Sequence, residues 1–178
     1  MTTVPAISTD CLGWAQAAGY SCSADEATGT TILYSAGPEP TRYYIRRRAR
    51  DRIQLTQADD SDERTILFAV DTMVLERHLY GILGDDIRDD LSLPYLDLPW
   101  TEADLASGFQ ISAADSRGYR TLSGSGCGPV AAAPDPTMGL LTLVPLSHFL
   151  GLSPKQLRQS FLSESGEPLL RAGRYTSR

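Results

Sequence analysis

The sequence Thr65–Leu91, TILFAVDTMVLERHLYGILGDDIRDDL, joins an apolar run to the clearest helix pattern in the chain. The run Thr65–Val70 predicts a buried β-strand. Asp71 and Thr72 follow it, and their side-chain oxygens can cap the first backbone N–H groups of a helix that runs to about Leu91. Apolar residues then recur at spacings of three and four, which places them on one helical face: Leu75, Leu79, Ile82, Leu83 and Ile87. The stretch therefore predicts one strand followed directly by one amphipathic helix.

Two glycines, Gly81 and Gly84, interrupt this helix. Each glycine costs roughly 1 kcal/mol of helix stability relative to alanine. We expect a close contact with the helix backbone to compensate for this cost, or the helix to bend at these positions.

Short strand patterns lie on both sides of this helix along the chain. Before the helix they are Thr30–Ser35, Arg42–Arg48 and Arg52–Gln57. After it, a second β region contains Gly108–Ala113, Tyr119–Ser123, Val130–Ala133 and the strongly apolar run Leu140–Leu146. Glycine, proline, aspartate and serine residues separate most of these runs and predict short turns. Short strands joined by short turns imply antiparallel pairing.

Two shorter helices are expected near the ends of the chain. Ser8, Thr9 or Asp10 can cap a helix over Cys11–Ala18. Ser153 and Pro154 are typical of the start of a helix, here over Lys155–Leu162.

Together these patterns predict an α+β fold with a single domain over residues 1–170. The domain is expected to contain an antiparallel sheet of roughly six to nine strands with about three helices packed on it. Strands and helices do not alternate as βαβ units, which disfavours a doubly wound nucleotide-binding fold. Residues 171–178 form a polar tail that is expected to be frayed.

The composition disfavours several functional classes. The chain has 178 residues, of which 42% are hydrophobic, and this suits one globular domain rather than a disordered chain. No apolar stretch approaches the ~18 residues of a membrane span. The net charge of −6 argues against nucleic acid as a partner, because phosphate binding needs a basic surface. Three widely spaced cysteines without a recognisable secretory signal predict free thiols in the cytoplasm.

No segment matches a catalytic or metal-binding motif. Gly124–Gly128 lacks the lysine of a phosphate-binding loop and predicts a tight turn. A cryptic hydrolase that uses Cys127 with His148, or Ser125, is the alternative, but no local pattern supports it. The three cysteines and two histidines also lack the close spacing of metal ligands. We therefore expect no enzyme activity, no cofactor and no metal.

The other polar candidates favour structural roles. His148 lies in an apolar run, which predicts a hydrogen-bonded histidine in the core or at its edge. His78 lies near the margin of the main helix and is expected to be solvated or to cap it. The pair Asp85 and Asp86 lacks the EF-hand pattern and is expected on the solvated face of the helix.

Two charged segments have more than one interpretation. The basic run Arg46–Arg52, RRRARDR, could contact nucleic acid. Its acidic neighbours, and the expected placement of Tyr44, Arg46 and Arg48 on one strand face, favour a solvated hairpin rim. The segment Asp59–Glu63 carries four carboxylates in five residues. Such a loop is usually only solvated, but it could also steer a basic protein partner.

Several segments, taken in order, resemble a known family. They are GWAQAAGY at 13–20, RYYIR at 42–46, VLERHLYGILGDDIRDDLSLPYLDLPW at 74–100, LVPLSHFLGL at 143–152 and SFLSESGEPLL at 160–170. Together they resemble the actinobacterial immunity proteins of polymorphic toxin systems, in the group that includes the immunity factor for tuberculosis necrotizing toxin. The resemblance extends from about residue 10 to 170 and rests on structural segments, not on a catalytic signature.

This resemblance implies a cytosolic, non-enzymatic antitoxin with an immunity-type domain over residues 1–170. The toxin of that group is an NAD glycohydrolase, and its immunity factor docks on it and blocks access to the NAD site. The implied partner is a cognate toxin domain bound one-to-one, with no nucleic acid, membrane or small-molecule substrate. The alternative that the residues leave open is a small-molecule-binding or regulatory α+β domain without catalysis.

No toxin-contacting position is carried over from the family, so partner-binding residues are predicted from this sequence alone. Exposed charged and aromatic loop residues are the usual material of recognition. This criterion selects Asp59, Asp60, Asp62 and Arg64 on one loop, and Arg117 and Tyr119 on a hairpin turn.

Overall fold

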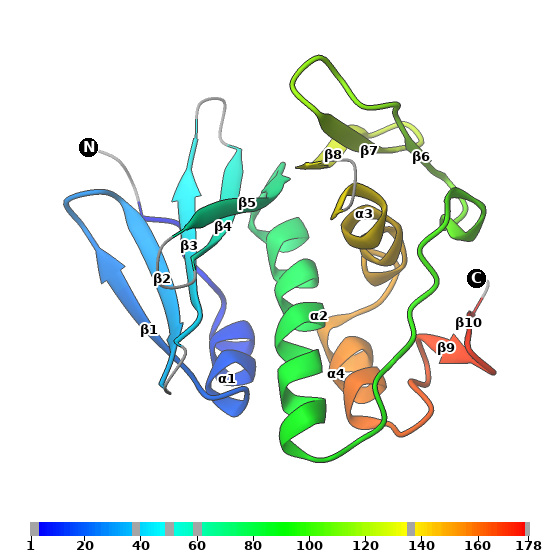
Figure 1. The fold of residues 1–178 in the computed structure, drawn as a ribbon, viewed down its shortest axis with the longest axis horizontal. Helices are drawn as coiled ribbons and strands as arrows, with labels where there is room; N and C mark the ends of the chain where they lie inside the picture. The colour runs from blue at the N-terminus through cyan, green and yellow to red at the C-terminus, as the bar shows by residue number, and fades with distance from the viewer. Residues whose placement is uncertain (1–3, 37–39, 49–51, 59–61, 135–137, 177–178) are drawn as a thin grey trace.

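Eight strands form one antiparallel sheet in the computed structural model, which describes residues 4–36, 40–48, 52–58, 62–134 and 138–176. Their spatial order is β1-β2-β3-β4-β5-β8-β7-β6 (Figure 1). The strands are β1 (Tyr20–Asp25), β2 (Thr30–Ser35), β3 (Arg42–Arg47), β4 (Ile53–Ala58), β5 (Glu63–Ala69), β6 (Phe109–Ile111), β7 (Tyr119–Gly124) and β8 (Gly128–Pro134). The predicted α+β class and sheet size are confirmed.

Most strands lie where the sequence predicts them, to within two residues at each end. The exception is β1, which was not predicted. Its residues, YSCSAD, are mostly exposed at the edge of the sheet, so they lack the alternation of apolar and polar residues that marks a half-buried strand.

Four α-helices lie in the described part of the chain, together with one 3-10 helix. They are α1 (Thr9–Ala17), α2 (Thr72–Asp90), α3 (Met138–Phe149), α4 (Pro154–Leu162) and the 3-10 helix η2 (Glu102–Asp104). The side chains of Ser8, Asp71 and Ser153 accept backbone N–H groups at helix starts, which confirms the predicted caps. Among the residues described, no helix is both long and apolar enough to span a bilayer.

Helix α3 corrects the prediction that Leu140–Leu146 belongs to a β region. Its residues Leu143, Val144 and Leu146 are all fully buried, because the helix is enclosed on several sides. A helix without a polar face lacks the three- and four-residue periodicity that distinguishes it from a buried strand. Pro145 lies inside this helix, against the usual preference.

The sheet consists of two parts that meet at β5 and β8 (Figure 1). These strands pair only through Phe68 with Ala132 and Ala69 with Ala131, whereas β4 and β5 pair along most of their length. Helix α2 packs under β4 and β5, and α3 packs under β7 and β8. The contact between α2 and α3 therefore joins the two parts on the core side of the sheet, beneath the short pairing of β5 with β8.

Arg88, near the end of α2, holds the helical layer together. Its side chain is buried to 1% exposure. The guanidinium donates hydrogen bonds to the carbonyl oxygens of Phe161 at 2.8 Å, Ser163 at 2.6 Å and Glu164 at 3.1 Å. Its Nε donates to the Pro94 carbonyl oxygen at 2.9 Å. One side chain therefore ties the end of α4 and the extended segment after α2 to α2 itself.

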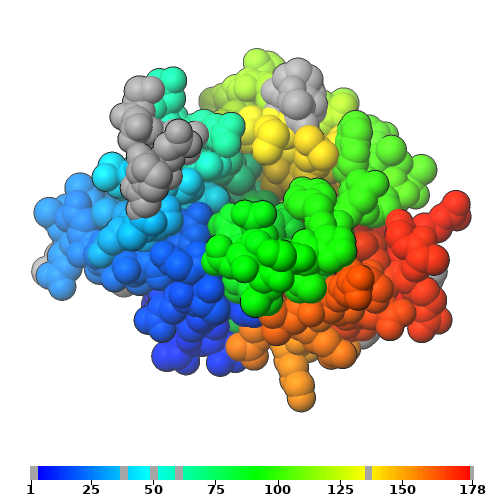
Figure 2. All heavy atoms as spheres, turned by 60° about the horizontal axis from the view of Figure 1, so that its bottom comes forward, coloured from blue at the N-terminus to red at the C-terminus, as the bar shows by residue number. Residues whose placement is uncertain are grey.

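That extended segment, residues 91–100, is called the strap here. Figure 2 shows the green part of the chain, which contains the strap, between the blue N-terminal region and the orange α4. Leu96 is buried, and the Tyr175 hydroxyl donates to the Pro99 carbonyl oxygen at 2.8 Å. The strap is therefore held at several points and has little freedom to move.

The C-terminal region corrects the expectation of a frayed tail. β9 (Leu170–Arg171) and β10 (Arg174–Tyr175) form a two-stranded hairpin. The ring of Tyr175 stacks on His148 with the ring centroids 3.6 Å apart. A tyrosine in the nominally polar tail thus packs on α3, which a local pattern cannot reveal.

Gly81 and Gly84 lie where two aromatic rings approach α2. A Cβ atom at Gly81 would come within 2.6 Å of the Phe149 ring, and one at Gly84 would overlap the Phe161 ring. The two rings pack edge to face with their centroids 6.0 Å apart. The predicted close contact at both glycines is confirmed, because rings from α3 and α4 occupy the space of the missing side chains.

Three polar residues of α2 are more enclosed than the sequence predicts. His78 is buried, and its Nε2 has no hydrogen-bond partner among the described residues. Burial lowers the pKa of His78 to about 4, so this ring is neutral at pH 7. Asp85 and Asp86 each bury one carboxylate oxygen that likewise lacks a partner there. The expected solvated positions are wrong because α2 contacts α1, α3, α4 and the sheet.

Gly84→Ala is expected to destabilise the protein by about 1–3 kcal/mol, because the added methyl group overpacks the contact with Phe161. Urea unfolding measures this change. Gly13→Ala in α1 is the matched control, since nothing lies within 4 Å of its Cβ position. The free energy of unfolding of this control variant should rise by up to about 1 kcal/mol, because alanine has a higher helix propensity than glycine. A stabilised Gly84→Ala variant would contradict the role assigned to the ring contact.

Asp85→Asn is expected to stabilise the protein at pH 7 and not at pH 3. Burial, and to a lesser extent Asp86, raises the pKa of Asp85 to about 6. The folded state thus binds this proton more tightly than the unfolded state, so the unfolding free energy falls as the pH rises from about 4 to about 6 and stays lower above that. At pH 7 the variant should have a free energy of unfolding about 2 kcal/mol above that of the unmodified protein. Urea unfolding at both pH values tests this, with exposed Asp90→Asn as the control. Equal gains from both variants would refute it.

Candidate functional site

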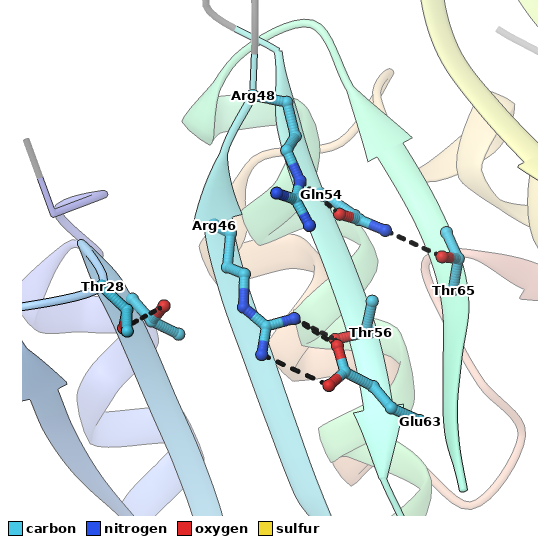
Figure 3. A network of polar contacts seen from close by, with 8 residues as sticks. Thr28, Arg46, Arg48, Gln54, Thr56, Glu63 and Thr65 are labelled. Carbon is cyan, nitrogen blue, oxygen red and sulfur yellow. Dashed lines mark hydrogen bonds and ion pairs between the residues drawn. The ribbon is translucent and has the colours of Figure 1, made fainter. Parts of the chain in front are cut away.

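The face of the sheet opposite the helices, called the open face here, carries the side chains that alternate with the core. In β3, Tyr43 and Ile45 are buried, so Tyr44 and Arg46 point outward. The Arg46 guanidinium lies 4.7 Å from the centre of the Tyr44 ring. The predicted placement of these two residues on one strand face is confirmed, and Arg48 lies on the same face (Figure 3).

An ion pair between Arg46 of β3 and Glu63 of β5 spans three strands of the open face (Figure 3). Thr56, on β4 between them, donates its hydroxyl to the Glu63 carboxylate at 2.7 Å and accepts from Arg46 at 3.3 Å. The hydrogen bond from Arg46 lowers the pKa of the Glu63 carboxyl, so the pair is fully charged at neutral pH.

A second chain of hydrogen bonds runs beside the first. Arg48 donates to the Gln54 side-chain oxygen at 2.6 Å, and the Gln54 amide donates to the Thr65 hydroxyl at 2.8 Å (Figure 3). Gln54 and Thr56 are buried beneath these longer side chains. The side chains of β3, β4 and β5 are therefore already ordered, which lowers the entropy cost of binding a partner on this face.

The open face is basic although the chain is acidic overall. The arginines whose positions alternate onto this face, on β3 or next to β3 and β4, are Arg42, Arg46, Arg48 and Arg52. The carboxylates that the register places on the same face of β1 to β5 are Asp25 and Glu63. An acidic chain with a net charge of −6 thus has one face on which arginine predominates.

The predicted partner-binding residues fall at two separate places along β5. Asp62 and Arg64 lie at its start, where Arg64 donates to Gln57 at 2.9 Å. Asp59 and Asp60 lie outside the described residues. Tyr119 packs on Phe68 near the other end of β5, with ring centroids 5.7 Å apart. The two groups are therefore roughly 20 Å apart along the strand.

The hairpin turn before β7 carries the last predicted residue. Arg117 is exposed, and its backbone N–H donates to the Asp115 carboxylate at 2.8 Å. The Tyr119 N–H donates to the same carboxylate at 2.9 Å. These two bonds lower the pKa of Asp115 and hold the turn in one conformation.

A groove of about 340 Å³ opens at the junction of β5 and β8. Its lining is mainly apolar: Phe68, Val70, Thr121, Val130 and Ala132, with Arg52 at one side. The prediction from sequence missed these residues, because the criterion was exposed charge on loops. The run of three alanines, 131–133, on a strand was the available signal, since small side chains leave a hollow.

A family model described as Immunity protein 61 matches residues 14–169 of the chain. The chain belongs to the Immunity protein 61 family. The match extends from α1 to the residue before β9, so it includes both the helical layer and the open face.

Curated relatives in the same family match over nearly the whole chain. The protein named "Immunity factor for TNT" from Mycobacterium tuberculosis is 31% identical over 175 residues, which is 95% of each chain. Its homologue from Mycobacterium bovis matches to the same extent. The solved structure of Rv3902c from M. tuberculosis has a TM-score of 0.83 and 31% identity, covering 95% of this chain and 96% of that one. The fold is thus shared with a solved structure.

His148 and Cys127, which were considered for catalysis, both make hydrogen bonds with backbone groups in this Immunity protein 61 family member. His148 is half-buried and its Nε2 lies 2.7 Å from the Asp104 carbonyl oxygen, which confirms the predicted core or edge histidine. Cys127 lies in the tight turn before β8, where its N–H donates to the Gly124 carbonyl oxygen at 3.1 Å. Within the described ranges, no group of three potential ligands could hold a metal ion.

A cavity of about 660 Å³ lies between η2, α3 and the C-terminal hairpin. Its polar groups hydrogen-bond to one another: Ser147 donates to the Val144 carbonyl oxygen and accepts from the Ala106 N–H. His148 and Tyr175, which also line it, bond to backbone carbonyl oxygens. The donors and acceptors described here already have partners, so the cavity provides little recognition chemistry for a ligand.

The strap presents exposed apolar side chains on another side of the molecule. Tyr95 is 78% exposed, and Leu91 and Trp100 are about half exposed. The exposed carboxylates Asp90 and Asp97 lie close to them in sequence. The strap is therefore a second exposed surface, acidic where the open face is basic.

Proposed function

We propose that this protein is an antitoxin that binds a cognate toxin domain one-to-one and blocks its active site by steric occlusion. The observation that carries this function is the full-length likeness to proteins named as immunity factors for TNT, at 31% identity over 95% of both chains. Membership of the Immunity protein 61 family supports it. A protein that acts by covering the active site of a toxin needs an ordered binding surface, and it needs no catalytic group of its own.

We infer further that the toxin is an NAD glycohydrolase. The inference rests on the resemblance to the group of immunity factors whose toxin has this activity. Occlusion of an NAD site requires only that the toxin cannot bind NAD and the antitoxin at the same time. An interface of about 800 Å² per partner with a few anchoring side chains can reach the affinity that this demands.

We propose the open face as the surface that contacts the toxin. It is rigid, it carries ordered arginine and carboxylate pairs, and it has no role in closing the core. Our predicted contact residues are Asp62 and Arg64 at the start of β5, Arg117 and Tyr119 at the hairpin into β7, and Asp59 and Asp60, which lie outside the described residues. A toxin bound across them would cover the length of β5.

We infer a cytoplasmic location, where the antitoxin would protect the cell that makes it. All three cysteines, Cys11, Cys22 and Cys127, are free thiols, which suits a reducing compartment. Cys22 and Cys127 are exposed, and exposed free thiols do not persist in an oxidising environment.

An NAD-hydrolysis titration tests the proposed function. The toxin domain encoded beside this protein, or else TNT itself, is assayed with rising amounts of the purified protein. We expect activity to fall linearly and to end at one equivalent, with a 1:1 complex on size-exclusion chromatography. Full activity at excess protein, without a complex, would refute the pairing with that toxin.

Reversing the charge of the loop into β5 tests its part in recognition. The combined change Asp59→Lys, Asp60→Lys and Asp62→Lys is expected to slow association with the toxin about tenfold at low salt, because clustered charge steers encounter. The effect should nearly vanish at high salt, where screening removes it. Stopped-flow binding measures both rates. Asp89→Lys with Asp90→Lys, at the end of α2, is the control; the same slowing there would show a general charge effect instead.

A further inference from the structure

The groove at the junction of β5 and β8 is a permanent feature of the backbone arrangement. Only two residue pairs join these strands, Phe68 with Ala132 and Ala69 with Ala131. Ala69 and Ala131 are buried on the core side, so Phe68 and Ala132 face outward. Ala132 also pairs with Thr121 of β7. The methyl group of Ala132 therefore forms the floor of the groove. The larger side chains of Phe68 and Thr121 stand on either side of it.

The walls of the groove are apolar and partly exposed. Val70 is 44% exposed, although it follows directly on a strand of the core. Its backbone N–H donates to the Val130 carbonyl oxygen at 2.9 Å, which fixes one wall of the groove against the other. Phe68 is fixed by its contact with Tyr119. The groove is thus rigid, and its apolar surface faces solvent without a covering element among the described residues.

The charge around the groove is positive. Arg52 lines it, and Arg48 donates its backbone N–H to the Arg52 carbonyl oxygen at 2.7 Å, which fixes the backbone that carries both arginines. No ion pair of the Arg52 side chain is found within the described ranges. Arg48 contacts only the neutral Gln54 through its side chain there. The guanidinium of Arg52 is consequently available to a carboxylate from outside.

We propose that this groove is the anchor pocket of the toxin interface, and that it takes an apolar side chain of the toxin with a carboxylate beside it. The inference rests on the proposed antitoxin function and adds the chemistry of the partner. The apolar side chain would fill the space above Ala132, and the carboxylate would pair with Arg52. A volume of about 340 Å³ suits one large side chain, as expected for the central anchor of an interface.

The position of the groove fits this role. It lies beside Phe68, whose ring contacts Tyr119, and it borders the ordered network of β3, β4 and β5. A buried apolar anchor with polar contacts beside it is the arrangement that gives many protein interfaces their affinity.

Filling the groove tests the proposal. Ala132→Leu places a larger side chain in the hollow, and it points away from the core, so the fold should tolerate it. We expect the dissociation constant for the toxin to rise at least tenfold, measured by calorimetry, with the urea midpoint little changed. Arg52→Glu should weaken binding by a similar factor, because it repels the proposed carboxylate. This second variant keeps the proposal testable should Ala132→Leu fold poorly.

Two controls separate the outcomes. Ser23→Leu adds an apolar side chain to the same face on β1, far from the groove, and should bind within twofold of the unmodified protein. Tyr95→Ala removes the exposed ring of the strap and should also bind within twofold. Normal binding by both Ala132→Leu and Arg52→Glu would overturn the anchor pocket while the antitoxin function stands. If Tyr95→Ala weakens binding to the toxin and the two groove variants do not, the interface lies on the strap and not at the groove. If the unmodified protein does not bind the toxin, the antitoxin function and the pocket both fail.

Discussion

The buried guanidinium of Arg88 is the interaction on which the helical layer depends. A charge in the interior is tolerated only when its donors are satisfied. Here the donors meet carbonyl oxygens at and after the end of α4, where the unpaired backbone groups of a helix carry partial negative charge. The same side chain also binds the strap at Pro94. The end of α4 and the strap are thereby fixed to one point on α2.

The packing of the other helices on α2 then determines which face of the sheet stays uncovered. Its two glycines admit the rings of Phe149 and Phe161, so α3 and α4 pack close against it. Because all of the apolar faces of the helices are used on one side, the described residues leave the other side of the sheet without a covering layer. That side is not simply solvated, since its arginine, glutamate, glutamine and threonine side chains bond to one another (Figure 3).

This division leaves both histidines inside the packed layer or at its edge. Histidines that sequence alone could connect with chemistry are buried at His78 or bonded to a backbone oxygen at His148. The polar chemistry that remains accessible lies on the open face, where the sheet is rigid and a groove interrupts it. Changes in the loops and in the groove would alter this surface without altering the fold.

The sequence by itself determined the fold class, most strands and the α2 helix with its Asp71 cap, and its resemblance to known proteins indicated the family. These features depend on periodicity, turn residues and caps, which act over a few neighbouring residues. Tertiary structure decided the helix over 138–149, the burial of Asp85, the packing of Tyr175 and the groove above Ala132. Each of these arises from contacts between segments distant in the chain, and a local pattern records only whether a residue is apolar or polar, not what lies opposite it. Asp62 and Tyr119, predicted as partner-binding residues, lie at the starts of β5 and β7, but only the pairing of β5 with β8, and of β8 with β7, sets the distance between them.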